Sequence, residues 1–221
     1  MMRASLLVWT ILAVTSLATS RCAYAADAAA TDAIKRPATL RAPSQFTSIL
    51  DDGTRAIALF EEAGKVIRSP RCLNCHPASD TPTQTDAMRP HRPQVLRGAA
   101  GGGAPGMPCQ TCHHETNFDP AHVPGHTGWH LAPRSMAWAG RSLGEICVQM
   151  KDPARNGGRD LTALVRHMAE DGLVGWAWSP GADRTPAPGT QQQFGALLNA
   201  WAQSGALCPP VTASEKGAAR G

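Results

Sequence analysis

The sequence predicts a small, mostly α-helical protein with long irregular loops and little or no sheet. Three observations lead to this expectation. Apolar residues recur at three- and four-residue spacing from 52 to 68 and in three segments of the last third, which is the period of an amphipathic helix. Runs of alternating β-branched residues, which would predict strands, are scarce. Between the helical parts, the stretch from 77 to 108 is rich in proline and glycine and favours turns.

The first 25 residues indicate a secretory signal peptide. Arg3 precedes an uncharged, mostly apolar run over 4–18, and Ala23-Tyr24-Ala25 has the small residues that a signal peptidase requires. The run is shorter than the ~20 residues of a membrane span, which disfavours a retained anchor. A lipid on Cys22 is also disfavoured, because bulky Arg21 precedes it. We therefore expect export to the periplasm and no membrane span in the mature chain.

Four regions follow from composition. After the signal peptide over 1–25, residues 26–45 are rich in Ala, Thr and Pro and are expected to form a flexible leader. A single folded domain is expected over 46–209, with a disordered tail over 210–221. Without the signal peptide the formal net charge falls from +4 to about +2, which is too weak a bias to indicate nucleic-acid binding.

The first helix is expected from Asp52 to Arg68. Ser69-Pro70 should end it, because proline disfavours helical backbone at the residue before it. One face of this helix is apolar or small, and its members are Ile57, Phe60, Ala63, Gly64 and Ile67.

Three further helices are expected near the C-terminus. Ser142 and Glu145 form a capping-box pattern that predicts a helix start. Asp160 is expected to cap a second helix that ends at Gly172. A third should begin at Thr190, three residues before Gln193. The apolar faces of the three comprise Ile146, Cys147 and Met150; Leu161, Leu164, Val165 and Met168; and Phe194, Leu197, Leu198 and Trp201.

Two segments share the pattern Cys-x-x-Cys-His, over 72–76 and 109–113. In an exported protein this pattern is typical of covalent haem c attachment. The two thiols add to the vinyl groups on one edge of the porphyrin, and the histidine then lies beneath the iron as its proximal ligand. We expect a cytochrome c-like helical fold built around two haem c groups. The attachment residues are Cys72, Cys75, Cys109 and Cys112, and the proximal ligands are His76 and His113.

Two other chemistries use paired cysteines. Two Cys-x-x-Cys pairs can hold a structural zinc ion, but here 33 residues separate the pairs and a histidine follows each. A thioredoxin-like redox pair requires a βαβ context that is absent from the predicted elements. Haem is therefore the favoured cofactor. It also accounts for the irregular stretch over 77–108, because a chain that wraps a large rigid cofactor needs little secondary structure of its own.

The sequence offers several candidates for the sixth ligand of each iron. His91 follows the first motif at a distance that lets the chain turn over a porphyrin ring, and we expect it to bind one of the two irons. The other iron is expected to take His130, which lies among apolar residues, or His167, which lies on the inner face of a predicted helix. Met136 is the main competitor. A methionine ligand would raise the reduction potential relative to two histidines.

The number of cysteines predicts a disulfide between Cys147 and Cys208. Six cysteines follow the signal peptide, and the two motifs use four of them. The remaining pair in an oxidising compartment predicts a bond, worth about 4 kcal/mol in the chain-entropy model for a loop of this length. Two free thiols are the alternative.

Residues 71–209 resemble a family of exported dihaem cytochromes often named as an isoquinoline 1-oxidoreductase subunit. Besides the two haem motifs, the resemblance rests on the following segments: His91-Arg92-Pro93, Trp129–Pro133, Lys151-Asp152-Pro153, Asn156–Arg159, His167, Trp176–Gly181 and Gly205–Pro209. The resemblance implies an electron acceptor for a molybdenum-dependent hydroxylase of N-heteroaromatics or aldehydes. The chain has no molybdopterin or iron–sulfur signature, so it would be the electron-transfer component.

The sequence thus predicts an electron-transfer protein rather than an enzyme. It would carry electrons between a partner oxidoreductase and a downstream acceptor in the periplasm. The alternative is a dihaem peroxidase-like or small-ligand-binding protein, in which one iron has an open sixth position. A third class, a sensor or scaffold with structural haems, would show no reduction by a partner.

Overall fold

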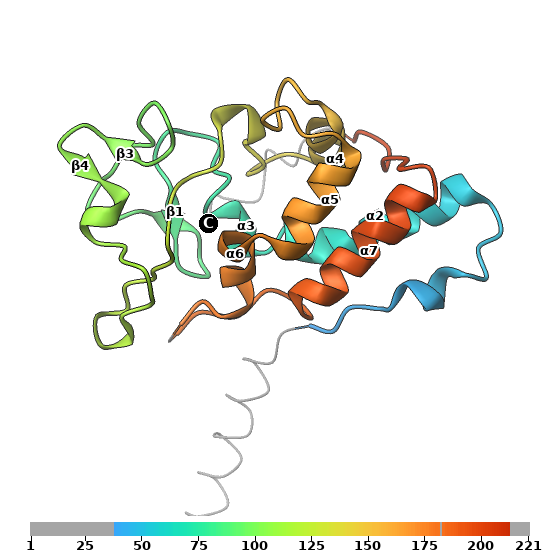
Figure 1. Ribbon diagram of the computed structural model, residues 1–221, viewed down its shortest axis with the longest axis horizontal. Coiled ribbons are helices and arrows are strands. Elements are labelled where there is room, and N and C mark those ends of the chain that lie inside the picture. Colours follow the sequence, from blue (N-terminus) through green and yellow to red (C-terminus); the bar gives the residue numbers. More distant parts are fainter. Residues whose placement is uncertain (1–37, 182, 213–221) are drawn as a thin grey trace, which may run out of the picture. The chain divides into compact units, whose positions relative to one another are not determined.

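The computed structural model describes residues 38–181 and 183–212, which form a mostly helical fold (Figure 1). The predicted fold class is confirmed to that extent. No helix among these residues is long and apolar enough to cross a membrane. The elements, in chain order, are η1 (Pro43–Phe46), α2 (Asp52–Ile67), α3 (Pro70–Leu73), β1 (Thr83–Gln84), β2 (Arg89–Pro90), β3 (Gly103–Ala104), β4 (Met107–Pro108), η2 (Cys109–Thr111), η3 (Asp119–Ala121), η4 (Arg134–Met136), α4 (Leu143–Lys151), α5 (Leu161–Glu170), α6 (Gly172–Gly175), η5 (Trp176–Trp178) and α7 (Gln191–Gln203).

The four predicted helices are confirmed as α2, α4, α5 and α7, and the last three have the expected N-caps. The N-cap of α2, Asp51, was not predicted. Ser142 and Glu145 form both hydrogen bonds of a capping box at the start of α4. Thr190 and Gln193 do the same for α7. Asp160 accepts a hydrogen bond from the amide of residue 163 at the start of α5. The short helices α3 and α6 were not predicted, since four residues are too few to show a periodicity.

The hydrophobic core lies between α2, α5 and α7, which run beside one another in Figure 1. Phe60 of α2 and Trp201 of α7 are fully buried, with ring centres 4.9 Å apart. Gly195 lets α7 approach α5 closely, because a Cβ there would lie 2.5 Å from the Cβ of Ala169. This packing makes α7 the central helix of the helical half.

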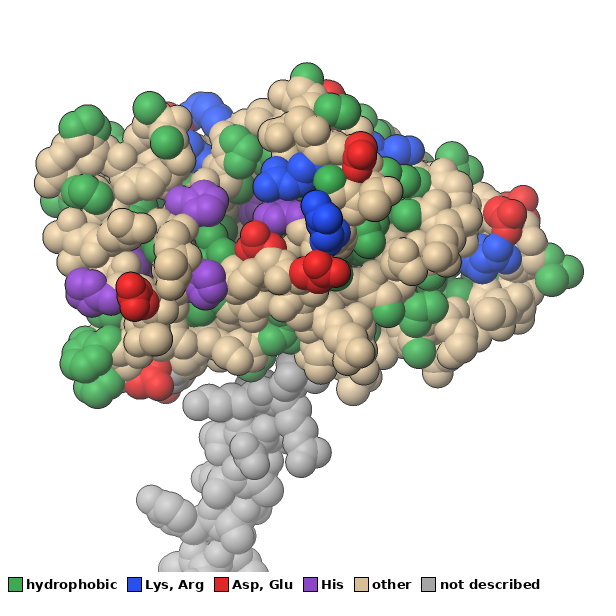
Figure 2. Space-filling view, viewed as in Figure 1, with side chains coloured by type: hydrophobic (Ala, Val, Ile, Leu, Met, Phe, Trp, Pro, Cys, Tyr) green, Lys and Arg blue, Asp and Glu red, His purple; other side chains and the backbone are tan. Residues whose placement is uncertain are grey.

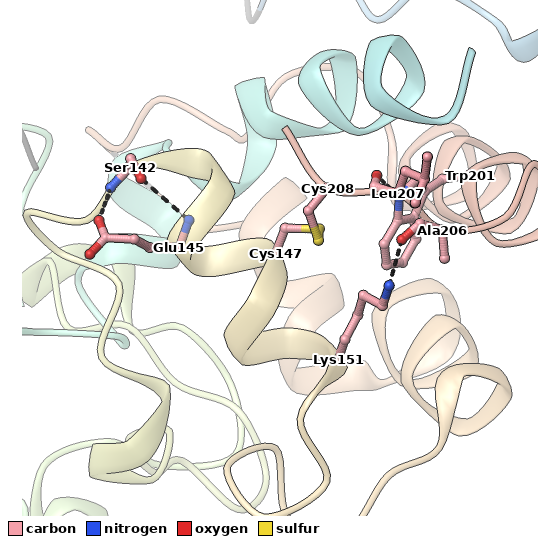
Figure 3. Close-up of a disulfide and its surroundings, with 8 residues drawn as sticks. All are labelled: Ser142, Glu145, Cys147, Lys151, Trp201, Ala206, Leu207 and Cys208. Carbon is pink, nitrogen blue, oxygen red and sulfur yellow. Dashed lines mark hydrogen bonds between the residues drawn. A yellow bond between two sulfur atoms is a disulfide. The ribbon is translucent and has the colours of Figure 1, made fainter. Parts of the chain in front are cut away.

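A disulfide joins α4 to the segment that follows α7, as predicted (Figure 3). It links Cys147, which is fully buried, to Cys208. Two hydrogen bonds hold the same segment: Lys151 Nζ donates to the carbonyl of Ala206 at 2.8 Å, and Trp201 Nε1 donates to that of Leu207 at 2.9 Å. The end of the described chain is thereby anchored to the core.

The predicted irregular stretch contains two small hairpins joined by long loops. Strands β1 and β2 pair antiparallel, as do β3 and β4, with two residues in each strand. The buried side chain of Arg97 ties these loops together, since it donates to the carbonyls of Ser79 and Ala132. Side chain–backbone bonds thus replace much of the secondary structure that this region lacks.

The end of the predicted leader is docked onto the fold, which corrects the expectation of flexibility for residues 38–45. Leu40 is buried, and so is Phe46 in the adjoining η1. The guanidinium of Arg41 binds the buried carboxylate of Glu62 at 2.8 Å. Single apolar anchors and one ion pair create no periodic pattern, so the composition did not reveal this contact. The predicted signal peptide, residues 26–37 of the predicted leader and residues 213–221 of the predicted tail lie outside the described residues.

Candidate cofactor sites

The two Cys-x-x-Cys-His motifs fold into the same turn. In each, the amides of the second cysteine and of the histidine both donate to the carbonyl of the first cysteine. The distances are 3.1 and 3.0 Å in the first motif (72–76) and 3.2 and 3.0 Å in the second (109–113). The first motif obtains this turn from α3 and the second from η2. The local geometry therefore repeats at two places that are far apart in the sequence.

Each motif histidine is held in the same way. Nδ1 of His76 donates to the carbonyl of Met136 at 2.7 Å, and Nδ1 of His113 donates to that of Pro124 at 2.7 Å. Neither ring forms a hydrogen bond to the described residues through Nε2. A metal-binding histidine typically donates its other ring N–H to a carbonyl or carboxylate, which fixes the tautomer. Both rings are therefore oriented to offer Nε2 to a metal.

A tryptophan stacks on each of these rings. The ring of His76 lies against Trp138 with centres 3.5 Å apart and an interplanar angle of 8°. The ring of His113 lies against Trp129 at 4.8 Å and 13°. Stacking restricts ring rotation, so hydrogen bond and tryptophan together fix each imidazole.

The first motif faces a cavity of about 220 Å³ between the loop half and helices α5 to α7. Apolar side chains form much of the wall, including Leu164 and Phe194. Three of the four predicted distal ligands also line it. The potential attachment and ligand residues of this cavity are Cys72, Cys75, His76, His130, His167 and Met136.

Burial keeps the cysteines and the histidine of the first motif uncharged. It raises the pKa of Cys72 to about 12 and that of Cys75 to about 11, so both thiols are protonated at neutral pH. It lowers the pKa of His76 to about 4, so the imidazole is neutral. A neutral imidazole is the form that binds iron, whereas buried, protonated thiols are poor redox nucleophiles.

The wall of this cavity also contains two arginines, Arg71 and Arg159. The side chain of Arg71 is only 2% exposed; its guanidinium pairs with Asp86, while Nε has no partner among the described residues. A buried donor without an acceptor is unfavourable unless a bound group supplies one. Haem has two carboxylate side chains, so the charge of the wall fits this cofactor. Arg71 was not predicted, because its only signal in the sequence is its position next to Cys72.

The backbone of Met136 has a role of its own, since its carbonyl accepts the hydrogen bond from Nδ1 of His76. Met136 also lines the first cavity, so it stays a candidate ligand beside His130 and His167.

His130 and His167 also line the first cavity and could each bind an iron there. Nδ1 of His130 contacts the carbonyl of Gly128 at 2.5 Å, and Nδ1 of His167 contacts the carboxylate of Asp171 at 3.3 Å. Each contact leaves Nε2 available. His167 is also partly buried on α5, and burial lowers its pKa, which favours the neutral ligand form.

The second motif lies among the loops, in a more open setting. Cys112 is exposed and Cys109 is half-buried. The structure places His91 here, with its ring centre 5.9 Å from that of His113; His91 does not line the first cavity. It also borders a surface cavity of about 580 Å³ beside the β1–β2 hairpin. Histidines gather on one face where the loops meet the helices (Figure 2).

The two sites are close to each other. Burial has the largest effect on the pKa of Cys75, and Cys109 of the second motif is near enough to raise it further. Trp129, stacked on His113, meets Trp176 edge-on at 4.9 Å, and Trp176 lines the first cavity. The second site therefore adjoins the wall of the first.

Within the described residues, no group of three or more His, Cys, Asp or Glu side chains is arranged to hold a metal ion. A zinc site built from both cysteine pairs would require four such ligands, whereas a haem iron takes at most two from the protein. No protein-family model, curated protein or solved structure matches this chain.

Proposed function

We propose that this chain is an exported dihaem c-type cytochrome that transfers electrons between a partner oxidoreductase and a downstream acceptor. One haem is attached through Cys72 and Cys75 and the other through Cys109 and Cys112. His76 and His113 are the proximal ligands.

The observation that carries this proposal is the repeated geometry of the two motifs. Both make the same turn, and both histidines donate Nδ1–H to a carbonyl at 2.7 Å and stack on a tryptophan. The carbonyl acceptors and the stacked tryptophans lie outside the two five-residue motifs, so the motif pattern alone does not supply them. A pair of equivalent sites indicates two equivalent cofactors.

The chain's own residues would position the cofactors and control their surroundings. Haem supplies a one-electron Fe(III)/Fe(II) couple, whose potential depends on ligands, burial and hydrogen bonds. The carbonyls of Pro124 and Met136 hold the proximal rings, and apolar side chains form much of the wall of the first cavity. The contact of Trp129 with Trp176 at 4.9 Å, which joins the second site to the wall of the first, supports exchange of electrons between the sites.

The signal peptide and the Cys147–Cys208 disulfide support a periplasmic location. The resemblance to dihaem cytochromes named as isoquinoline 1-oxidoreductase subunits supports a molybdenum-dependent dehydrogenase as the partner. We propose this partner on the resemblance alone.

Intact mass spectrometry of the protein exported from a host with a cytochrome c maturation system tests the proposal. We expect the mass of the mature chain plus two haems, and the reduced α-band of a c-type cytochrome. Serine substitution at both cysteines of either motif should remove one haem. A colourless protein without covalent haem in that host would refute the proposal.

An enzyme with an open iron is the competing function. His91 beside His113, and His130 and His167 at the first cavity, give each iron a candidate sixth ligand. We therefore expect slow, substoichiometric binding of CO to the reduced protein. Rapid binding of one CO per chain would favour the peroxidase-like alternative.

A further inference from the structure

We infer that His91 is the sixth ligand of the second iron, so that the haem on Cys109 and Cys112 has two histidine ligands. This inference rests on the proposed function. It also decides which iron His91 serves, a question that the sequence left open.

The separation of the two rings fits one iron between them. The ring centres of His91 and His113 lie 5.9 Å apart. Two imidazoles on opposite sides of one metal have centres roughly 6 Å apart, since each metal–nitrogen bond is about 2 Å and each ring centre lies about 1 Å further on.

Both rings also have the hydrogen-bond pattern of metal ligands. Nδ1 of His91 contacts the carbonyl of Pro93 at 2.9 Å, as Nδ1 of His113 contacts that of Pro124 at 2.7 Å. Nε2 of each ring makes no hydrogen bond to the described residues. A carbonyl on the far nitrogen sets the tautomer that a metal ligand needs.

The β1–β2 hairpin holds His91 in this place. His91 directly follows β2, and its amide donates to the carbonyl of Pro82 at 3.0 Å, which extends the ladder of the hairpin. Asn74 of the first motif contacts the hairpin twice, by donating to the carbonyl of Thr85 and by accepting from the hydroxyl of Thr83. Asp86 in its turn binds the buried Arg71 at 2.5 Å.

Asn74 and Arg71 of the first site thus hold the β1–β2 hairpin in place. The same hairpin positions His91, the ligand proposed for the second iron. The sequence position of His91, between the motifs, suits this bridging role.

Two histidine ligands predict a lower reduction potential than one histidine and one methionine would give. The planes of the two rings meet at 65°. Strongly inclined ligand planes give a low-spin ferric haem with a markedly anisotropic EPR signal, which we expect for the second haem.

His91→Ala in the full dihaem protein tests the assignment, with His122→Ala as the control because His122 is an exposed histidine of the same loops. EPR and magnetic circular dichroism should show one of the two low-spin haems becoming high-spin in His91→Ala, and added imidazole should restore it. His122→Ala should retain both low-spin signals. Two unchanged low-spin haems in His91→Ala would overturn the inference.

A double variant identifies the iron without removing any attachment cysteine. If His91 and His113 serve one iron, His91→Ala/His113→Ala disturbs a single haem, and EPR spin counting finds the other low-spin signal intact. If they serve different irons, both low-spin signals are lost and the inference fails. Absence of covalent haem from the unsubstituted protein would instead refute the proposed function, so the two failures are distinguishable.

Discussion

The two candidate cofactor sites have the same local turn but very different surroundings. The first faces a cavity walled by α5 to α7, and burial raises the pKa of Cys75 to about 11. The second lies among loops and hairpins, where Cys112 is exposed. The short motif therefore specifies the local turn, whereas the packing around it specifies the electrostatic environment.

If the proposed function holds, this difference gives the two haems different roles. The first haem would complete the core between the two halves, since its cavity adjoins Leu164 and Phe194 of the main hydrophobic cluster. The second haem, near exposed Cys112, would be the one that partners approach. Four predictions test this comparison.

Loss of the first attachment site should affect folding far more than loss of the second. Cys72→Ser/Cys75→Ser should lower the free energy of unfolding by more than about 4 kcal/mol, the size of an exceptional core loss. Cys109→Ser/Cys112→Ser should lower it by about 1–2 kcal/mol, as is usual for more exposed positions. Urea denaturation followed by far-UV circular dichroism measures both. Equal losses would contradict the division between a core haem and a peripheral haem.

The disulfide should stabilise the helical half without influencing the second haem. Cys147→Ala/Cys208→Ala opens a loop with a sequence separation of 61 residues, worth about 4 kcal/mol in the chain-entropy model. We expect a loss of about 2–4 kcal/mol in denaturant titrations. The EPR signal of the second haem should not change, and a change there would show that the two halves are coupled through α4.

Asp86 should couple the two sites. Asp86→Asn leaves the buried guanidinium of Arg71 without its counter-ion and loosens the hairpin of His91. Breaking a buried pair costs about 3–5 kcal/mol; because Asp86 is itself 41% exposed, we expect about 2–3 kcal/mol.

The low-spin signal of the second haem should also broaden in Asp86→Asn. The matched control is Asp52→Asn, which removes an exposed ion pair with Arg55 and should cost less than about 1 kcal/mol. Indistinguishable stabilities of the two variants would show that Arg71 needs no counter-ion.

Substitution of Glu62 should have the smallest effect on the free energy of unfolding and should leave the spectra of both haems unchanged. Burial alone would raise its pKa, but hydrogen bonds from Lys65 and Arg41 lower it below the usual value of 4.5. Its contribution to stability is therefore present at neutral pH and is lost as the pH falls below about 4.5. Glu62→Gln should be less stable than the unsubstituted protein at pH 7, and the gap should narrow in acid. A gap that is constant with pH would show that the ion pairs contribute nothing.

Local patterns accounted for much of the fold. Capping boxes join residues three positions apart, so Ser142–Glu145 and Thr190–Gln193 were visible in the sequence and occur in the structure. The Cys147–Cys208 pairing was also predictable, because counting left no other partners. Leu40, in contrast, was assigned to a flexible leader, because a single buried side chain creates no period.

The sequence by itself determined which segments are helical and which residues form the two repeated motifs, since both depend on spacings of a few residues. Only the tertiary structure decided which groups meet. It placed His91 beside His113, made the carbonyl of Met136 the support of His76, and buried Arg71 against Asp86. These contacts join residues 15 to 60 positions apart across loops without periodicity, where the path of the chain depends on packing and on isolated hydrogen bonds.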